Sequence, residues 1–88
     1  MQFEGALVQE QGQTFAIVVV KRNVGTGGDS ERRKAAASFA SVFPGVPIVL
    51  MWQDARGVPE YWGRPDIVKF LASIDMTRIP WQRYTLAA

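Results

Sequence analysis

Residues 14–20, "TFAIVVV", decide the fold of this chain. The run is rich in β-branched residues and nearly all apolar, which is typical of a strand buried on both faces and therefore central in its sheet. Residues 3–8, "FEGALV", alternate loosely, and the glycine in "QEQGQ" (residues 9–13) predicts a turn. We expect these two runs to form a β-hairpin.

A glycine-rich stretch, residues 23–30 ("NVGTGGDS"), leads from this strand into a predicted helix over residues 30–43. The apolar residues of the helix recur at the i, i+3, i+4 and i+7 spacing of one face. They are Ala36, Phe39, Ala40 and Phe43. Asp29 or Ser30 is expected to cap the helix, since either short side chain accepts a hydrogen bond from a free amide of the first turn.

The second half of the chain predicts two strands, a helix and a last strand. Residues 46–53, "VPIVLMWQ", are an apolar strand, and residues 58–63, "VPEYWG", are a short one. Because Pro59 has no amide donor, the short strand belongs at a sheet edge. Residues 64–75, "RPDIVKFLASID", form an amphipathic helix, and residues 79–86, "IPWQRYTL", are the last strand.

The predicted fold class is α+β, as a single domain over residues 1–88 with the order ββαββαβ. We expect one mixed sheet of about five strands with both helices on one face, and a right-handed crossover that makes strands 15–20 and 48–52 parallel. The apolar runs are much shorter than the roughly 20 residues of a membrane span. The first residues lack the features of a signal peptide, so we expect a cytoplasmic protein without membrane contact.

Residues 46–75 join a Val-Pro step, an apolar strand, a hairpin, a glycine and an amphipathic helix. This segment resembles the C-terminal half of a thioredoxin-like domain. The resemblance implies that layout for about a third of the chain, with a cis peptide bond before Pro47. The Cys-x-x-Cys of that family is absent here, an N-terminal hairpin replaces its first strand-helix unit, and an extra strand follows the last helix, so thiol–disulfide activity is not implied.

The composition excludes several chemistries. The chain has no cysteine and no histidine, which excludes disulfides, thiolate metal sites and Ser-His-Asp or Cys-His catalysis within it. Asp54 and Glu60 flank a hairpin and are a possible acid–base pair, although Asp54 is equally suited to a turn with Arg56. The eight acidic residues are otherwise scattered singly, so we expect no enzyme, no metal and no cofactor.

The glycine-rich stretch is one candidate site, because free amides at a helix start attract anions. The possible anion-binding residues are Arg22, Gly25, Gly27, Gly28, Ser30, Arg32 and Arg33. The dinucleotide fingerprint is incomplete, since Ser30 replaces its third glycine, and Asp29 would repel phosphate. Nucleotide or nucleic-acid binding is therefore the alternative function, although the net charge of +2 is small. The alternative interpretation is that the glycine-rich stretch is a flexible connection whose glycines take positive φ.

The aromatic and arginine residues of the second half are the leading candidate, because three tryptophans are many for 88 residues. The predicted interaction surface consists of Trp62, Arg64, Trp81, Arg83 and Tyr84. Tyr61 and Trp62 are adjacent in a strand and should face opposite sides of the sheet. We expect a non-enzymatic interaction or self-association domain, with a homodimer or a protein partner covering the free sheet face. The alternative interpretation is that these residues form a second small core, with arginine stems packed over the rings.

Overall fold

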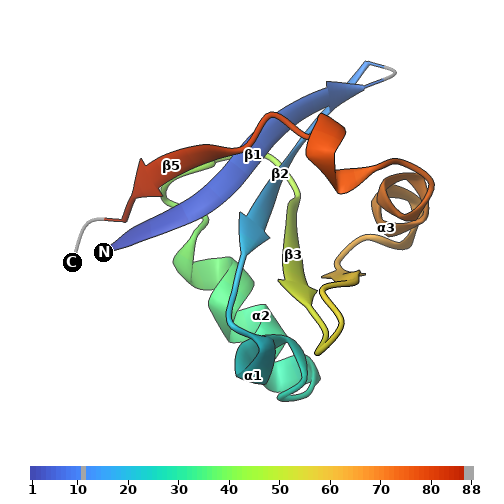
Figure 1. Cartoon of the computed structure of the whole chain (residues 1–88). Coiled ribbons are helices and arrows are strands. Elements are labelled where there is room, and N and C mark those ends of the chain that lie inside the picture. The colour runs from blue at the N-terminus through green and yellow to red at the C-terminus, as the bar shows by residue number, and fades with distance from the viewer. Residues whose placement is uncertain (11, 87–88) are drawn as a thin grey trace.

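The computed structural model describes residues 1–10 and 12–86, which form one mixed sheet with strand order β4-β3-β2-β1-β5 (Figure 1). The strands are β1 (Gln2–Glu10), β2 (Gln13–Val19), β3 (Ile48–Gln53), β4 (Pro59–Trp62) and β5 (Gln82–Thr85). The helices are α1 (Arg22–Gly25), α2 (Asp29–Ser38) and α3 (Pro65–Ala72), and Met76–Arg78 form a 3-10 turn, η1. The predicted α+β class, ββαββαβ order and five-stranded mixed sheet are confirmed, whereas α1 and η1 were not predicted.

The central strand is β2, as its apolar sequence predicts. It runs antiparallel to β1 and parallel to β3, with Ile17 beside Ala6 on one side and Val49 on the other. Its residues 15–18 are all buried, which accounts for a run with no polar alternation. The hairpin turn was predicted over residues 9–13, of which residue 11 lies outside the described residues.

The two ends of the sheet are β4 and β5, so the prediction that Pro59 marks an edge strand is confirmed. β4 runs antiparallel to β3, with Tyr61 opposite Met51 and Glu60 opposite Trp52. β5 runs antiparallel to the first residues of β1, with Tyr84 opposite Phe3. The first and last strands of the chain, β1 and β5, therefore lie side by side at one end of the sheet, while the hairpin of the second half forms the other edge (Figure 1).

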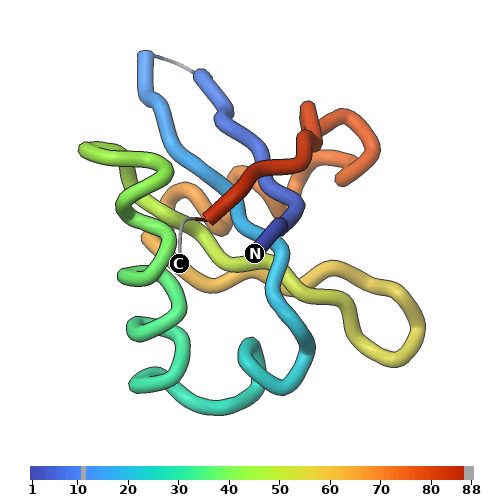
Figure 2. Tube along the Cα trace, turned by 90° about the vertical axis from the view of Figure 1, so that its left-hand side faces the viewer, coloured from blue at the N-terminus to red at the C-terminus, as the bar shows by residue number. Residues whose placement is uncertain are grey.

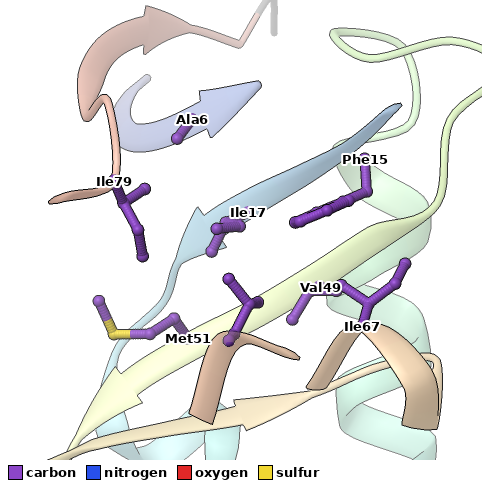
Figure 3. Close-up of a cluster of buried hydrophobic side chains, with 8 residues drawn as sticks. Ala6, Phe15, Ile17, Val49, Met51, Ile67 and Ile79 are labelled. Atoms are coloured by element: carbon purple, nitrogen blue, oxygen red, sulfur yellow. The ribbon is translucent and has the colours of Figure 1, made fainter. Parts of the chain in front are cut away.

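The expectation that both helices cover one face is wrong: α2 and α3 pack on opposite faces of the sheet. The α3 cluster of buried side chains, shown in Figure 3, contains Ala6, Phe15, Ile17, Val49, Met51, Ile67, Leu71 and Ile79. The α2 cluster contains Phe3, Ala16, Val18, Phe39, Phe43, Leu50 and Trp52. Because neighbouring strand residues point to opposite faces, a strand buried on both sides needs a layer on each.

The chain path explains how both faces are covered. α2 connects β2 with its parallel neighbour β3, whereas α3 follows β4 at one edge and precedes β5 at the other. The segment containing α3 therefore crosses the sheet, and the α3 residues Ile67 and Leu71 are buried against it. Each face of the described sheet already carries a helix, so no free face is left for a partner to cover.

The start of α2 also differs from the prediction. The N-cap residue is Gly28, with φ of 103°, and Asp29 is the first helical residue, so neither Asp29 nor Ser30 caps the helix. The helix ends at Ser38, although Phe39 and Phe43 are buried as the predicted apolar face requires. Gly28 takes the N-cap because the chain enters the helix through a left-handed conformation that favours glycine.

Residues 46–75, for which a thioredoxin-like layout was predicted, contain β3, β4 and α3 in the order strand, hairpin and helix, and the family resemblance stays a prediction. The described residues contain no cis peptide bond, so the bond before Pro47 is trans, contrary to the expectation from that resemblance.

Within residues 1–10 and 12–86, no helix has the length and apolar character needed to cross a membrane.

Candidate functional site

The glycine-rich stretch is a tightly packed joint between α1 and α2. Gly25 lies in a helical turn and is buried against Trp52, where an added Cβ would come within 2.0 Å of the indole Cδ2. The Arg32 guanidinium donates through Nε to the Gly25 carbonyl at 2.8 Å. In this stretch only Gly28 has a positive φ, so the backbone conformation of Gly25 does not require glycine. The close packing against Trp52 requires it instead.

The charged groups around this joint are largely paired with one another. The Asp29 carboxylate accepts hydrogen bonds from Arg32 at 3.2 Å and from the Trp62 indole at 3.3 Å, and Arg33 lies 3.9 Å from it. Arg22, Gly27 and Ser30 are exposed. The structure therefore brings Arg32 and Arg33 to Asp29, and anion binding stays a prediction.

The predicted interaction surface divides between the two edges of the sheet. Trp62 and Arg64 belong to the β4 edge, and Trp81, Arg83 and Tyr84 belong to the β5 edge. Four strand spacings separate these edges, roughly 19 Å. The five residues therefore do not form one continuous surface.

The residues at the β5 edge mostly fill the core. Tyr84 stacks on Phe3 with ring centroids 5.6 Å apart and meets Phe43 edge-on. Trp81 packs against the α3 cluster, and its indole donates to the Met76 carbonyl at 2.9 Å. Arg83 is exposed on β5. This edge fits the alternative interpretation of aromatic residues as core, with one arginine left on the surface.

At the β4 edge, Tyr61 and Trp62 face opposite sides of the sheet, as predicted. Tyr61 packs against the α3 cluster and Trp62 against the α2 cluster. Arg64 is held by Asp66 through two hydrogen bonds, of 2.9 and 2.6 Å, and this guanidinium lowers the pKa of Asp66 to about 2. Neither Trp62 nor Arg64 is therefore free of intramolecular partners.

The two carboxylates of the β3–β4 hairpin have separate structural roles. Asp54 accepts hydrogen bonds from the backbone amides of Arg56 and Val58 at 2.8 and 3.0 Å, which builds the turn. Glu60 accepts from the Trp52 indole at 2.8 Å. Each carboxylate is used by its own partner, which provides no support for an acid–base pair.

The backbone of β4 has hydrogen-bonding groups that point away from the sheet. The Asp54 amide donates to the Val58 carbonyl at 3.0 Å, so residues 58, 60 and 62 direct their backbone groups toward β3. Residues 59 and 61 therefore direct theirs outward. Since Pro59 has no amide, the outward groups are the Pro59 carbonyl and both the amide and the carbonyl of Tyr61.

A groove of about 520 Å³ runs beside this edge, between β4 and α3. Its lining is mostly apolar and consists of Val58, Pro59, Glu60, Tyr61, Val68, Leu71, Ala72 and Ile74. The Tyr61 hydroxyl is buried here, and among the described residues it has no hydrogen-bond partner. Burial raises the pKa of the Tyr61 phenol. A buried hydroxyl without a partner is uncommon in folded proteins.

The sequence indicated part of this site. It predicted that Pro59 lies in an edge strand and that Tyr61 and Trp62 face opposite sides of the sheet. It did not predict the groove, because the groove depends on where α3 lies.

Comparison of the chain with family models, curated proteins and solved structures finds no match. In residues 1–10 and 12–86, no cluster of three acidic side chains is placed to hold a metal ion.

Proposed function

We propose that this protein is a non-enzymatic interaction domain that captures an extended segment of a partner protein at the β4 edge. The observation that carries the proposal is the free amide and carbonyl of Tyr61 beside an apolar groove. An edge strand with unpaired backbone groups is a template for one more strand, and a helix beside it supplies pockets for side chains.

The groove determines which side chains the partner presents. In an added strand every second side chain points to the α3 side of the sheet, where Val68 and Ala72 line the groove over buried Leu71. Apolar partner side chains fit these positions because they remove apolar surface from water.

The size of the site sets the expected strength of binding. β4 has four residues and offers only two outward groups at Tyr61 and one at Pro59, so an added strand is short. Interfaces below about 1,200 Å² are typical of weak, transient complexes. We therefore expect dissociation constants of about 1–100 μM, the range of a module that binds and releases its partner.

The test is selection of peptides from a random library displayed on phage, followed by NMR titration of the selected peptides. Binding peptides should alternate apolar residues and should perturb the amides of residues 58–72. Ala72→Arg places a charge in the groove and should weaken binding at least tenfold. Ala37→Arg, at an exposed alanine of α2 on the other face, is the matched control and should leave binding unchanged.

Three results would contradict the proposal. The first is a set of selected peptides that perturb amides away from β4 and α3, and the second is equal weakening by the two arginine substitutions. The third is a dimer, detected by sedimentation at micromolar concentration, that Ala72→Arg dissociates. That outcome would make a second copy of the chain the occupant of the groove.

A further inference from the structure

A second hollow lies on the α2 side of the sheet, away from β4. The pairing of β1 with β2 ends at Gly5 and Val18, and the first residues of β1 pair with β5 instead. A cleft of about 470 Å³ lies where the two strands separate, bounded by the start of β1, the end of β2, α1 and α2. Figure 2 shows these elements, with the N-terminus of β1 in front of the end of β2 and α2 beside them.

The walls of this cleft are apolar. Phe3 and Phe39 are buried, their ring centroids lie 4.7 Å apart, and both line the cleft. Val20, Val24 and Ala35 extend the apolar lining. Pockets of about 300–1,000 Å³ with apolar walls and few polar groups are typical of small-molecule sites.

Two cationic groups accompany these apolar walls: the side chain of Lys21 and the N-terminal ammonium group of Met1, which donates to the Leu86 carbonyl at 3.3 Å. Among the described residues that line the cleft, Lys21 alone has a charged side chain. Lys21 follows the end of β2 and is exposed, and it makes no ion pair with any described acidic residue. An ammonium group without an ion-pair partner beside apolar walls is complementary to a ligand with a negative charge and an apolar tail.

We propose that this cleft binds a medium-chain monocarboxylate. The alkyl tail lies over Phe3 and Phe39, and the carboxylate lies at Lys21. The Lys21 ammonium group pairs with the single charge of a carboxylate, while the Met1 ammonium group stays bonded to the Leu86 carbonyl. Burial of the tail supplies most of the affinity, and Lys21 sets the orientation and the preference for an anion. The proposal is independent of the β4 edge.

The probes are hexanoate, octanoate and decanoate, each titrated below its micelle concentration, and decanol, titrated below its solubility limit. Binding to the labelled protein is followed by NMR. Shifts should be confined to amides around the cleft, and each two-carbon extension should tighten binding about tenfold. Ala35→Leu fills the cleft and should weaken decanoate binding at least tenfold. Ala37→Leu is the control, because this alanine is exposed two residues further along α2 and the substitution has similar helix propensity.

The role of the cation has its own test. Lys21→Gln should weaken decanoate binding about threefold, the range of a partly exposed ion pair, and should leave decanol binding unchanged. The control is Lys69→Gln, at an exposed lysine of α3. Absence of saturable decanoate binding, affinity independent of chain length, or equal effects of Ala35→Leu and Ala37→Leu would overturn the proposal. If Lys21→Gln weakened the binding of decanoate and of decanol equally, the placement of the carboxylate at Lys21 would be wrong.

Discussion

The close contact between Gly25 and Trp52 gives the sharpest prediction for stability. A Cβ at position 25 would lie 2.0 Å from Trp52 Cδ2 and 2.4 Å from Cε2 and Cε3, so the indole must move. Trp52 is buried, and its Nε1 donates to Glu60 at 2.8 Å. Overpacking costs about 1–3 kcal/mol, and losing the packing of a large aromatic side chain costs about 3–5 kcal/mol. We expect Gly25→Ala to lower the free energy of unfolding by about 3 kcal/mol.

The assay is urea unfolding of a double-mutant cycle with Trp52→Val, in a stabilising osmolyte so that all four proteins fold. Once the indole is removed, Gly25→Ala should be neutral or stabilising by up to about 1 kcal/mol, because alanine favours a helical turn. The cycle should therefore give a coupling energy of at least about 2 kcal/mol. In thermal unfolding, Gly25→Ala alone should lower Tm by about 15 °C.

A small effect of Gly25→Ala, below about 0.5 kcal/mol, would refute this reasoning. Equal costs in the presence and absence of the indole would also refute it, because they would assign the requirement for glycine to the backbone. Gly27→Ala is the nearby control. Its Cβ would lie 3.0 Å from the Asn23 carbonyl, so its cost should stay below about 1 kcal/mol.

Three further predictions concern the groove, the two cores and the pH dependence. Tyr61→Phe removes a buried hydroxyl without a partner, so the free energy of unfolding should rise by about 1 kcal/mol, and a decrease in urea unfolding would show that the hydroxyl is satisfied. Phe39→Leu and Leu71→Val lie in separate clusters on opposite faces, so their costs of about 1 kcal/mol each should add within roughly 0.5 kcal/mol; a larger coupling would contradict two independent cores. The pKa of Asp66 is lowered from 3.8 to about 2 by Arg64, so the stability it contributes is present above pH 3.8 and is lost as the pH falls toward 2. Acid unfolding of Asp66→Asn should therefore show a smaller loss of stability over this range, and an unchanged profile would show that this pair contributes nothing.

Much of the fold was predictable because its signals are local. The run at residues 14–20 has no polar alternation, and this places β2 in the centre of the sheet. Pro59 has no amide, which places β4 at an edge, and Pro65 begins α3 because its fixed φ suits the first helical position. Each of these signals acts through the residue that carries it, so it can be recognised without knowledge of the tertiary structure.

The features that the sequence did not predict depend on contacts between distant segments. The face that α3 covers depends on which side of the sheet the chain crosses between β4 and β5, and no local residue pattern records that side. Gly25 was interpreted as a flexible position, but it is fixed by Trp52, which lies in β3. The Tyr61 hydroxyl lacks a partner only because of how β4 and α3 are placed, so its signal is absent from the residues around it.

The central claim is that the β4 edge accepts an additional strand, and hydrogen exchange of individual amides tests it most directly. In the free protein the Tyr61 amide points outward and should exchange much faster than the amides of Glu60 and Trp62, which face β3. A bound peptide should slow exchange at Tyr61 at least a hundredfold and change its neighbours much less. A Tyr61 amide that is already protected in the free protein, or that exchanges equally fast with the peptide bound, would contradict the account.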